Sequence, residues 1–217
     1  MGSIYSVVAF FQQGGLFMYP ILLVFAVGAA IAVERWIHLN RIRTENRRMW
    51  ELLHPMLVEG DFEQAREVAN NDKSTISQLL SMGLARQGAV RRREDIEIAM
   101  EESMMEIIPQ LEKRTSYLAL LANIATLLGL LGTIMGLIEA FTAVANANPA
   151  EKADLLSASI SVAMNTTAFG LITAIPLLLI HAKVTSTTGE IVDSLEMASV
   201  KALNSISNAA KRQFQAG

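Results

Sequence analysis

The chain has 217 residues, of which 52% are hydrophobic, and its formal net charge is −3. Such an apolar composition is unusual for a soluble domain, and the small net charge argues against a nucleic-acid partner. The sequence has no cysteine, which excludes disulfides, and its histidine and acidic residues show no metal-ligand spacing. We therefore expect a membrane protein without a metal centre.

Three largely uncharged stretches are long enough to cross a bilayer, whose core of about 30 Å needs about 20 helical residues. The first covers residues 16–36, where Tyr19 and Trp36 stand near opposite ends, as interfacial aromatic residues do. The second covers residues 115–144 and the third residues 155–182. The sequence therefore predicts an all-α membrane protein with three transmembrane helices.

Residues 37–114 are hydrophilic and predict a helical domain into which the long helices extend. Helices with amphipathic periodicity are expected over 46–58, 62–69, 74–86 and 94–113. Gly88 and the arginine run 91–93 mark a break between the last two. Pro109 is expected to kink the last helix without ending it. Residues 183–217 predict a C-terminal helix.

The basic residues predict the orientation of the chain in the membrane. Of the 18 Lys and Arg residues, Lys152 lies in the loop 145–154 between the second and third spans, and none precedes the first span. The positive-inside rule then places residues 1–15 and that loop outside the cytoplasm. The hydrophilic block and the C-terminal helix should be cytoplasmic, so the predicted topology is N-out and C-in.

Hydroxyl-bearing and small residues follow one stripe of the third span. Lipid offers hydroxyl groups no hydrogen-bond partner, so this stripe should face other helices or water. On an ideal helix it covers roughly 120°. Its members are Ser159, Ala163, Thr166, Thr167, Gly170, Thr173 and Ala174. Asn165 points away from the stripe and is expected to bond a neighbouring helix.

The second span has a matching face with Thr126 and Thr133. Gly129, Gly132 and Gly136 lie beside it, and the four-residue spacing of the last two is typical of close helix approach in membranes. Two interpretations remain open for both spans. In the first, the glycines of both spans, Gly170 included, and Asn165 pack the helices tightly against each other. Alternatively, the Thr133 and Thr167 hydroxyls could meet an ion or a partner's carboxylate along a hydrated path.

Charged residues are missing from the centre of every predicted span. Glu139 is the acid inside the second span, and it stands near the outer end. A relay for protons or sodium ions normally needs an ionisable group at depth. Either Glu139 therefore has a larger role than its position suggests, or the titrating group comes from another chain. A simple interfacial acid that bonds its neighbours is the alternative interpretation of Glu139.

Two motifs carry a family resemblance. GLLGTIMGLIEAF, residues 129–141, resembles the second-span motif of the ExbB/TolQ/MotA proton-channel family. TTAFGLITAIPLLLIHAK, residues 166–183, is similar to its third-span motif. The stretch from GGLFMYPILL to IAVERW, within residues 14–36, is closest to ExbB proteins.

The resemblance implies a homopentameric ring around an ExbD-like partner, a single-span protein with an essential membrane aspartate. Such a complex of the bacterial inner membrane would use the proton gradient to do mechanical work on a TonB-like protein. Transport without a covalent step implies no enzyme activity and no cofactor. By motif position, Thr133 and Thr167 would be pore-facing hydroxyls near the aspartate. The other residues assigned to the ion path are Thr126, Ser159, Thr166 and Thr173.

One position departs from the family pattern. ExbB and TolQ proteins usually carry a glutamate five residues before the third-span threonine, where this chain has Val162. The Thr166–Thr167 pair instead resembles that of sodium-driven stators, so a sodium ion at Thr133, Thr166 and Thr167 is an alternative. A TolQ-like envelope, division or motility subunit remains open, as does a passive membrane scaffold. Which process would be driven does not follow from the sequence.

Overall fold

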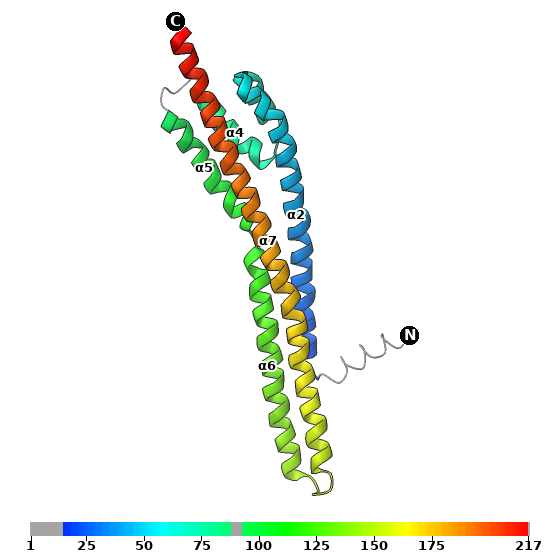
Figure 1. The fold of residues 1–217 in the computed structure, drawn as a ribbon. Helices are drawn as coiled ribbons and strands as arrows, with labels where there is room; N and C mark the ends of the chain where they lie inside the picture. Colours follow the sequence, from blue (N-terminus) through cyan, green and yellow to red (C-terminus); the bar gives the residue numbers. More distant parts are fainter. Residues whose placement is uncertain (1–14, 88–92, 217) are drawn as a thin grey trace, which may run out of the picture. The chain divides into compact units, whose positions relative to one another are not determined.

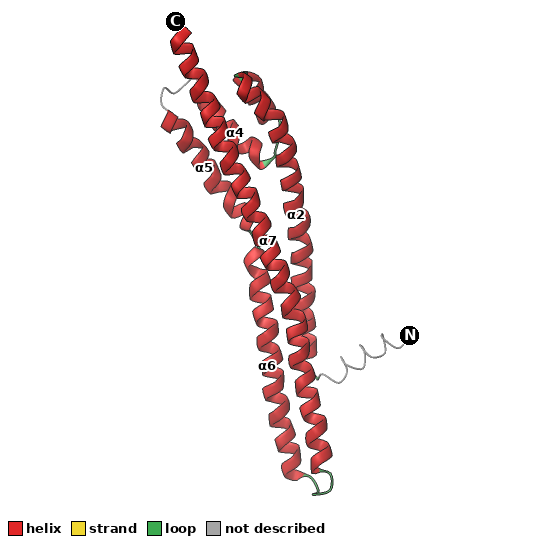
Figure 2. Cartoon of the chain, in the orientation of Figure 1, coloured by secondary structure: helices red, strands yellow, loops and turns green. Residues whose placement is uncertain are grey.

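A computed structural model of the chain describes residues 15–87 and 93–216 (Figure 1). These residues form helices and turns, and none of them forms a strand (Figure 2). The helices are α2 (Met18–Glu59), α3 (Phe62–Asn70), α4 (Thr75–Arg86), α5 (Arg93–Glu112), α6 (Thr115–Asn146) and α7 (Lys152–Ala216). Except for Gly15, the segment 1–15 lies outside the described residues, as do Gly88 and residues 91–92 of the expected break.

Three helical segments are long and apolar enough to cross a membrane: Met18–Glu59, Arg93–Asn146 and Lys152–Ala209. The predicted class, all-α with three transmembrane helices, is confirmed. Many large apolar side chains of these segments are exposed, among them Leu23, Leu127 and Leu179. Exposed apolar side chains are what a lipid-facing surface requires.

The α2 helix is longer than the sequence predicted. A separate short helix over residues 46–58 was expected, and this prediction is wrong because α2 continues without interruption for 42 residues. The change from apolar to amphipathic sequence near residue 37 contains no helix-breaking residue. The helix ends at Gly60, whose φ of +86° is the left-handed conformation that glycine adopts at helix C-termini. The N–H of Gly60 donates to the carbonyl of Met56 at 3.1 Å.

The chain divides into two compact units. Unit 1 comprises residues 1–34 and 114–183, and unit 2 comprises residues 35–113 and 184–217. The helices α2 and α7 each contribute to both. Within unit 1, α6 and the first half of α7 are antiparallel neighbours joined by the turn at 147–151 (Figure 1).

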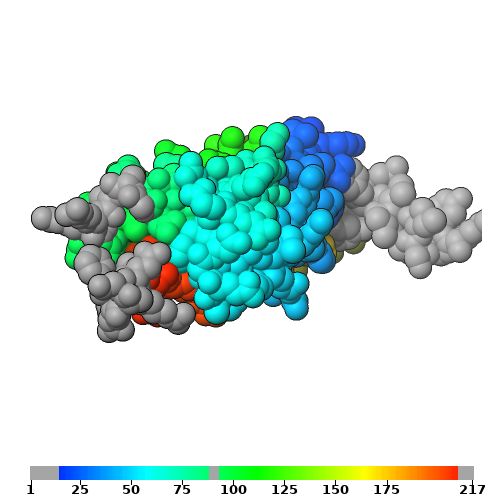
Figure 3. Space-filling model, turned by 90° about the horizontal axis from the view of Figure 1, so that it is seen from above, coloured from blue at the N-terminus to red at the C-terminus, as the bar shows by residue number. Residues whose placement is uncertain are grey.

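Unit 2 has a core of large apolar side chains. The fully buried members of this core include Leu53, Leu57, Leu79, Leu80, Leu84 and Met100. The side chain of Asp61 caps α3 and that of Ser74 caps α4. In the view from above, the cyan atoms of the end of α2 and of α3 form one continuous surface of this unit (Figure 3).

The break between α5 and α6 lies after Pro109. This proline is inside α5 and does not end it, as predicted. The helix ends three residues later, and Arg114 adopts a left-handed φ of 65° before α6 begins. At the end of α5, the buried Arg35 side chain donates a hydrogen bond to the Leu111 carbonyl. That bond supplies a donor to a helix end whose carbonyls lack partners.

Candidate functional site

The helices α6 and α7 approach most closely at Gly129 and Gly170. A Cβ atom placed on Gly129 would lie 3.3 Å from the Cα atom of Gly170. One placed on Gly170 would lie 2.7 Å from the carbonyl oxygen of Ala125, which is nearer than real side chains come. Both glycines are therefore required for the two backbones to meet. Close approach of this kind replaces hydrophobic burial as the source of helix association in a membrane.

The same contact continues along both helices. A Cβ on Gly132 would lie 2.4 Å from Cγ2 of Thr166, and one on Gly136 would lie 2.8 Å from Cβ of Ala163. The packing residues predicted from the sequence, the three glycines of α6 and Gly170, thus form one continuous seam. Their role in packing, and that of Asn165, stays a prediction.

The hydroxyl groups of Thr133 and Thr167 meet at the edge of this seam. The Thr133 hydroxyl also lies 3.2 Å from the Gly129 carbonyl oxygen and 3.2 Å from that of Ala163. The Thr167 hydroxyl lies 3.0 Å from the Gly129 carbonyl oxygen. Two hydroxyls and two backbone carbonyls therefore form a cluster of four oxygen atoms, contributed equally by α6 and α7. We call it the four-oxygen cluster.

The chemistry of the four-oxygen cluster follows from its count of hydrogens. Each hydroxyl has one hydrogen to donate and two lone pairs to accept. The cluster therefore has more acceptor positions than hydrogens, so either hydroxyl can redirect its hydrogen without breaking the packing. Thr133 and Thr167 are half-buried, so part of each residue remains accessible from outside the chain. The arrangement can accept a hydrogen bond from a protonated group or contribute oxygen ligands to a cation.

The other hydroxyls assigned to the ion path are placed differently. Thr166 and Thr173 are 2% and 1% exposed, so both are enclosed within the chain. The Thr166 hydroxyl donates to the Val162 carbonyl at 3.1 Å, and its methyl group packs on Gly132. Thr126 is exposed and donates to the Ala122 carbonyl, and Ser159 is half-buried. Thr126 and Ser159 thus keep surface that another chain or water can reach.

Glu139 and Asn165 lie apart from the four-oxygen cluster. Glu139 is exposed on α6, and Asn165 is half-buried on α7. The bond expected between Asn165 and a neighbouring helix stays a prediction, as does an accessory role for Glu139. The backbone carbonyls of Gly129 and Ala163 were not anticipated. For Gly129 the spacing was a signal, since it stands four residues before Thr133, whose hydroxyl reaches back to it. For Ala163 the sequence contains no such signal, because its carbonyl accepts from Thr133 of the other helix.

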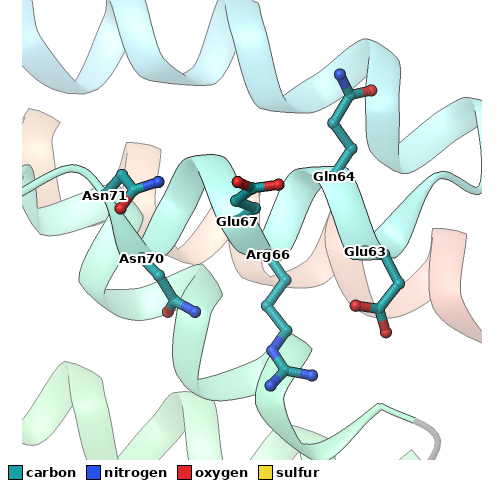
Figure 4. Close-up of a pocket in the computed structure, with 6 residues that line it drawn as sticks. All are labelled: Glu63, Gln64, Arg66, Glu67, Asn70 and Asn71. Carbon is teal, nitrogen blue, oxygen red and sulfur yellow. The ribbon is translucent and has the colours of Figure 1, made fainter.

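An open hollow lies on α3 (Figure 4). Its labelled side chains are Glu63, Gln64, Arg66, Glu67, Asn70 and Asn71, all from one helix and its cap. These side chains have mixed charge, and none of them comes from a second helix that would enclose the hollow. The hollow therefore has no feature of a binding site. Across residues 15–87 and 93–216, no group of three His, Cys, Asp or Glu side chains could hold a metal ion.

Comparison with known proteins gives a consistent result. Residues 71–197 match the sequence model of the MotA/TolQ/ExbB proton channel family. An ExbB homolog of Methanothermobacter thermautotrophicus, named for biopolymer transport, is 26% identical over 194 residues, which cover 88% of this chain and 67% of that protein.

Two shorter matches reach higher identity. The biopolymer transport protein exbB1 of Vibrio cholerae is 48% identical over 59 residues, which are 27% of this chain and 26% of that protein. The Tol-Pal system protein TolQ of Haemophilus influenzae is 37% identical over 78 residues, or 36% of this chain and 34% of that protein.

Proposed function

Because this chain belongs to the MotA/TolQ/ExbB proton channel family, we propose that it is the ion-conducting subunit of a motor in the bacterial inner membrane. It is a multi-pass membrane protein, and its family is one of channels rather than enzymes. In the proposed complex, several copies surround a single-span, ExbD-like partner. Ion flow then performs mechanical work on an envelope protein of the TonB type.

The observation that carries the proposal is the four-oxygen cluster. It brings together the hydroxyls of Thr133 and Thr167, which were assigned from separate motifs on separate spans. The cluster lies at the edge of the α6–α7 seam and keeps some exposed surface. A helix lying against that edge would find hydroxyl and carbonyl oxygens, a suitable surface for a carboxyl group that gains and loses a proton.

In this proposal the titrating carboxyl group comes from another chain. The four-oxygen cluster itself has no acid, and Glu139 follows Thr133 by six residues on α6. That spacing places Glu139 about 9 Å along the helix from Thr133 and turned by about 120°. A partner aspartate placed beside Thr133 and Thr167 would supply the missing group. Its protonated form would donate to the cluster, and its ionised form would accept from it.

The proposed topology is N-out and C-in, since the basic residues gather on one side of the spans. Unit 2 then lies in the cytoplasm and the turn at 147–151 outside. Each unit charge that crosses 100 mV releases about 2.3 kcal/mol. Several ions per mechanical step are therefore needed to break a firm contact elsewhere.

The test is ion flux through the complex reconstituted with its single-span partner in liposomes. Thr167→Val keeps the shape of the side chain and removes its hydroxyl, so we expect loss of flux with the complex still assembled. Thr142→Val is the matched control, because Thr142 is an exposed threonine of α6 whose hydroxyl donates to the Ile138 carbonyl. If the protein is a passive scaffold, neither variant should show ion flux. Equal ion flux through both variants would contradict the role of Thr167.

Sodium is the second candidate ion. The four-oxygen cluster favours it, because sodium prefers oxygen ligands and two hydroxyls with two carbonyls can supply several. Thr166 would not be a ligand without rearrangement, since it is enclosed and its hydroxyl donates to Val162. Flux at fixed membrane potential in sodium-free and sodium-rich buffer separates the two ions. Flux that does not depend on sodium removes this candidate.

A further inference from the structure

The α5 helix of unit 2 carries a concentration of negative charge. Residues 94–112 contain seven acids and no basic residue. None of the seven forms an ion pair with another residue of the described part of the chain. Glu97 and Glu101 stand four residues apart, as do Glu102 and Glu106, and like charges at that spacing destabilise a helix. A basic neighbour would relieve this repulsion.

Two large apolar side chains lie among these acids. Ile98 is 51% exposed, and Met105 is 73% exposed. At about 100° per residue, Met105 is turned about 20° from Ile98 and Glu102 about 40°, so the three share one face. Exposed apolar side chains with a rim of charge suit a contact with another protein. We call this surface, formed by Ile98, Glu101, Glu102, Met105 and Glu106, the acidic flank.

The α2 helix carries the opposite charge in the same unit. Residues 41–48 contain four arginines and one glutamate. Arg48 is exposed and forms no ion pair with a described residue. Arg41 pairs with Glu45 through its Nε atom at 2.8 Å, which leaves its terminal NH2 groups able to donate. Arg41, Arg48 and the exposed Leu52 lie within about 40° of one another, and we call them the basic flank.

Contacts with α7 relate the levels of the two flanks within unit 2. The Ser199 hydroxyl donates to the sulfur atom of Met100 at 3.0 Å. Lys201 stands two residues further along α7, and its Nζ atom lies 5.8 Å from the ring centre of Trp50. Residues two apart on a helix differ in height by about 3 Å, so Met100 is level with about residue 48 of α2.

A hydrogen bond at the other end of these helices gives a consistent alignment. Arg35 of α2 donates to the Leu111 carbonyl of α5. The two helices run in opposite directions along unit 2 (Figure 1). Counted from this bond, Arg48 and Met100 differ in level by about 3 Å. Arg48 is therefore level with Glu102 to within about one helical turn, a distance that the two long side chains can span.

The helices α5 and α2 lie on opposite sides of α7. Arg43 of α2 pairs with Glu190 of α7 at 3.2 Å, and Met100 of α5 accepts from Ser199 of α7. Figure 1 shows α7 passing between the other two helices of this unit. Among residues 15–87 and 93–216, no ion pair joins α2 to α5. One chain therefore does not neutralise its own two flanks.

We propose that the acidic flank of one copy docks on the basic flank of the next copy, with Glu102 paired to Arg48 and Ile98 packed on Leu52. The occupant is a second copy because both charges belong to one chain, at one level and on opposite sides of α7. Copies inserted in one membrane point the same way, so every junction of a ring can repeat this heterologous contact. The inference rests on the proposed function, which requires several copies around a partner.

Charge reversal tests the ion pair. Arg48→Glu and Glu102→Arg each place like charges at every junction. Each should lower the association constant of the copies in mild detergent by about twofold to thirtyfold, because a repulsion replaces an attraction of similar size. The chain with both substitutions has opposite charges again and should recover most of the loss. A double variant that associates no better than the single variants would contradict the contact.

The matched control for charge reversal lies in the same unit. Arg66 is exposed on α3, outside both flanks. Arg66→Glu changes the net charge by as much as Arg48→Glu does, so it corrects for any general effect of charge on association. It should leave the association constant unchanged. A loss equal to that of Arg48→Glu would contradict a specific role for the basic flank.

Cysteine cross-linking tests the packing of the flanks, since the chain has no cysteine of its own. Two differently tagged chains, one with Leu52→Cys and one with Ile98→Cys, are expressed together with the partner and oxidised in membranes. We expect a cross-linked product that contains both tags. In the control, Val200→Cys replaces Ile98→Cys, because Val200 is 55% exposed and nearly level with Ile98 but belongs to α7. A product with Val200→Cys in place of Ile98→Cys would overturn the contact.

These experiments separate the inference from the proposed function, because they need no ion gradient. Cross-linking together with normal ion flux in Thr167→Val would retain the contact and overturn the function. Ion flux that requires Thr167, without a product between Leu52→Cys and Ile98→Cys, would retain the function and overturn the contact. A thiol-to-amine reagent on Ile98→Cys that captures the single-span partner alone would also overturn it.

Discussion

The two units of this chain hold their helices together in opposite ways. In unit 1, the contact between α6 and α7 depends on the absence of side chains at Gly129 and Gly170, with threonine hydroxyls at its edge. In unit 2, the contacts depend on large buried side chains such as Leu80 and Met100. The proposed topology, with unit 1 in lipid and unit 2 in water, accounts for the difference, because lipid gives no hydrophobic force between helices, whereas water does. Unit 1 should therefore be destabilised when a seam glycine is replaced by a larger residue. Unit 2 should be destabilised when a core residue is replaced by a smaller one.

The largest effect is expected from shrinking the core of unit 2. Leu80 is 0% exposed, so Leu80→Ala leaves a cavity and should cost about 2–5 kcal/mol of unfolding free energy. Leu127→Ala in unit 1 is the matched control, because Leu127 is 63% exposed on a lipid-facing helix. Thermal unfolding in detergent measures both. Equal losses would contradict the contrast between the units.

Replacing a seam glycine of unit 1 by a larger residue should have the next largest effect on stability. In Gly170→Ala the new methyl group meets the Ala125 carbonyl oxygen at 2.7 Å, so backbone must move, at a cost of about 1–3 kcal/mol. Gly189→Ala in the same helix adds its methyl group in open space. That change should stabilise the helix by about 0.5–1 kcal/mol. Stabilisation by both substitutions would show that the seam does not require glycine.

A smaller loss is expected where unit 2 buries a polar side chain. The Asn46 side chain of α2 accepts from the Ile76 N–H at 3.1 Å and donates to the Thr75 hydroxyl at 2.7 Å, so it caps α4 from a distant part of the chain. Asn46→Ala should cost about 0.5–2 kcal/mol. The exposed Asn40 gives the control, Asn40→Ala, which should be neutral in the same thermal unfolding experiment.

Acid should produce the smallest effect, again in unit 2. Partial burial opposes ionisation of Asp72, but hydrogen bonds from Ser74, Ser77 and the Lys73 N–H outweigh it and hold its pKa below the ordinary value. A lowered pKa in the folded state means that this stabilisation is present above the unfolded pKa of about 3.9 and is lost as pH falls through the folded pKa. Asp72→Asn should therefore reduce the acid sensitivity of the melting temperature, measured from neutral pH down to about pH 3. An unchanged pH dependence would show that Asp72 does not contribute.

The three spans could be predicted from sequence because each depends on residues of one helix. The division of the hydroxyl stripe could not. Thr166 and Thr167 are adjacent, yet one is enclosed against Gly132 and the other reaches the edge of the seam. A stripe of about 120° covers both positions, and the neighbouring helix decides between them. The continuous α2 was also missed, since a change in solvent from lipid to water alters the composition of a helix without ending it.

Proton flux in liposomes that contain Thr167→Ser or Thr167→Val tests the central claim most directly. Serine keeps the hydroxyl that meets Thr133 and the Gly129 carbonyl, whereas valine keeps the shape and removes the oxygen. The four-oxygen cluster predicts that flux through the serine variant stays near that of the unmodified complex. It predicts that flux through the valine variant falls by at least about a hundredfold, the lower end of the range for loss of one proton-transfer group. Equal flux through the two variants would contradict a role for the Thr167 hydroxyl in ion movement.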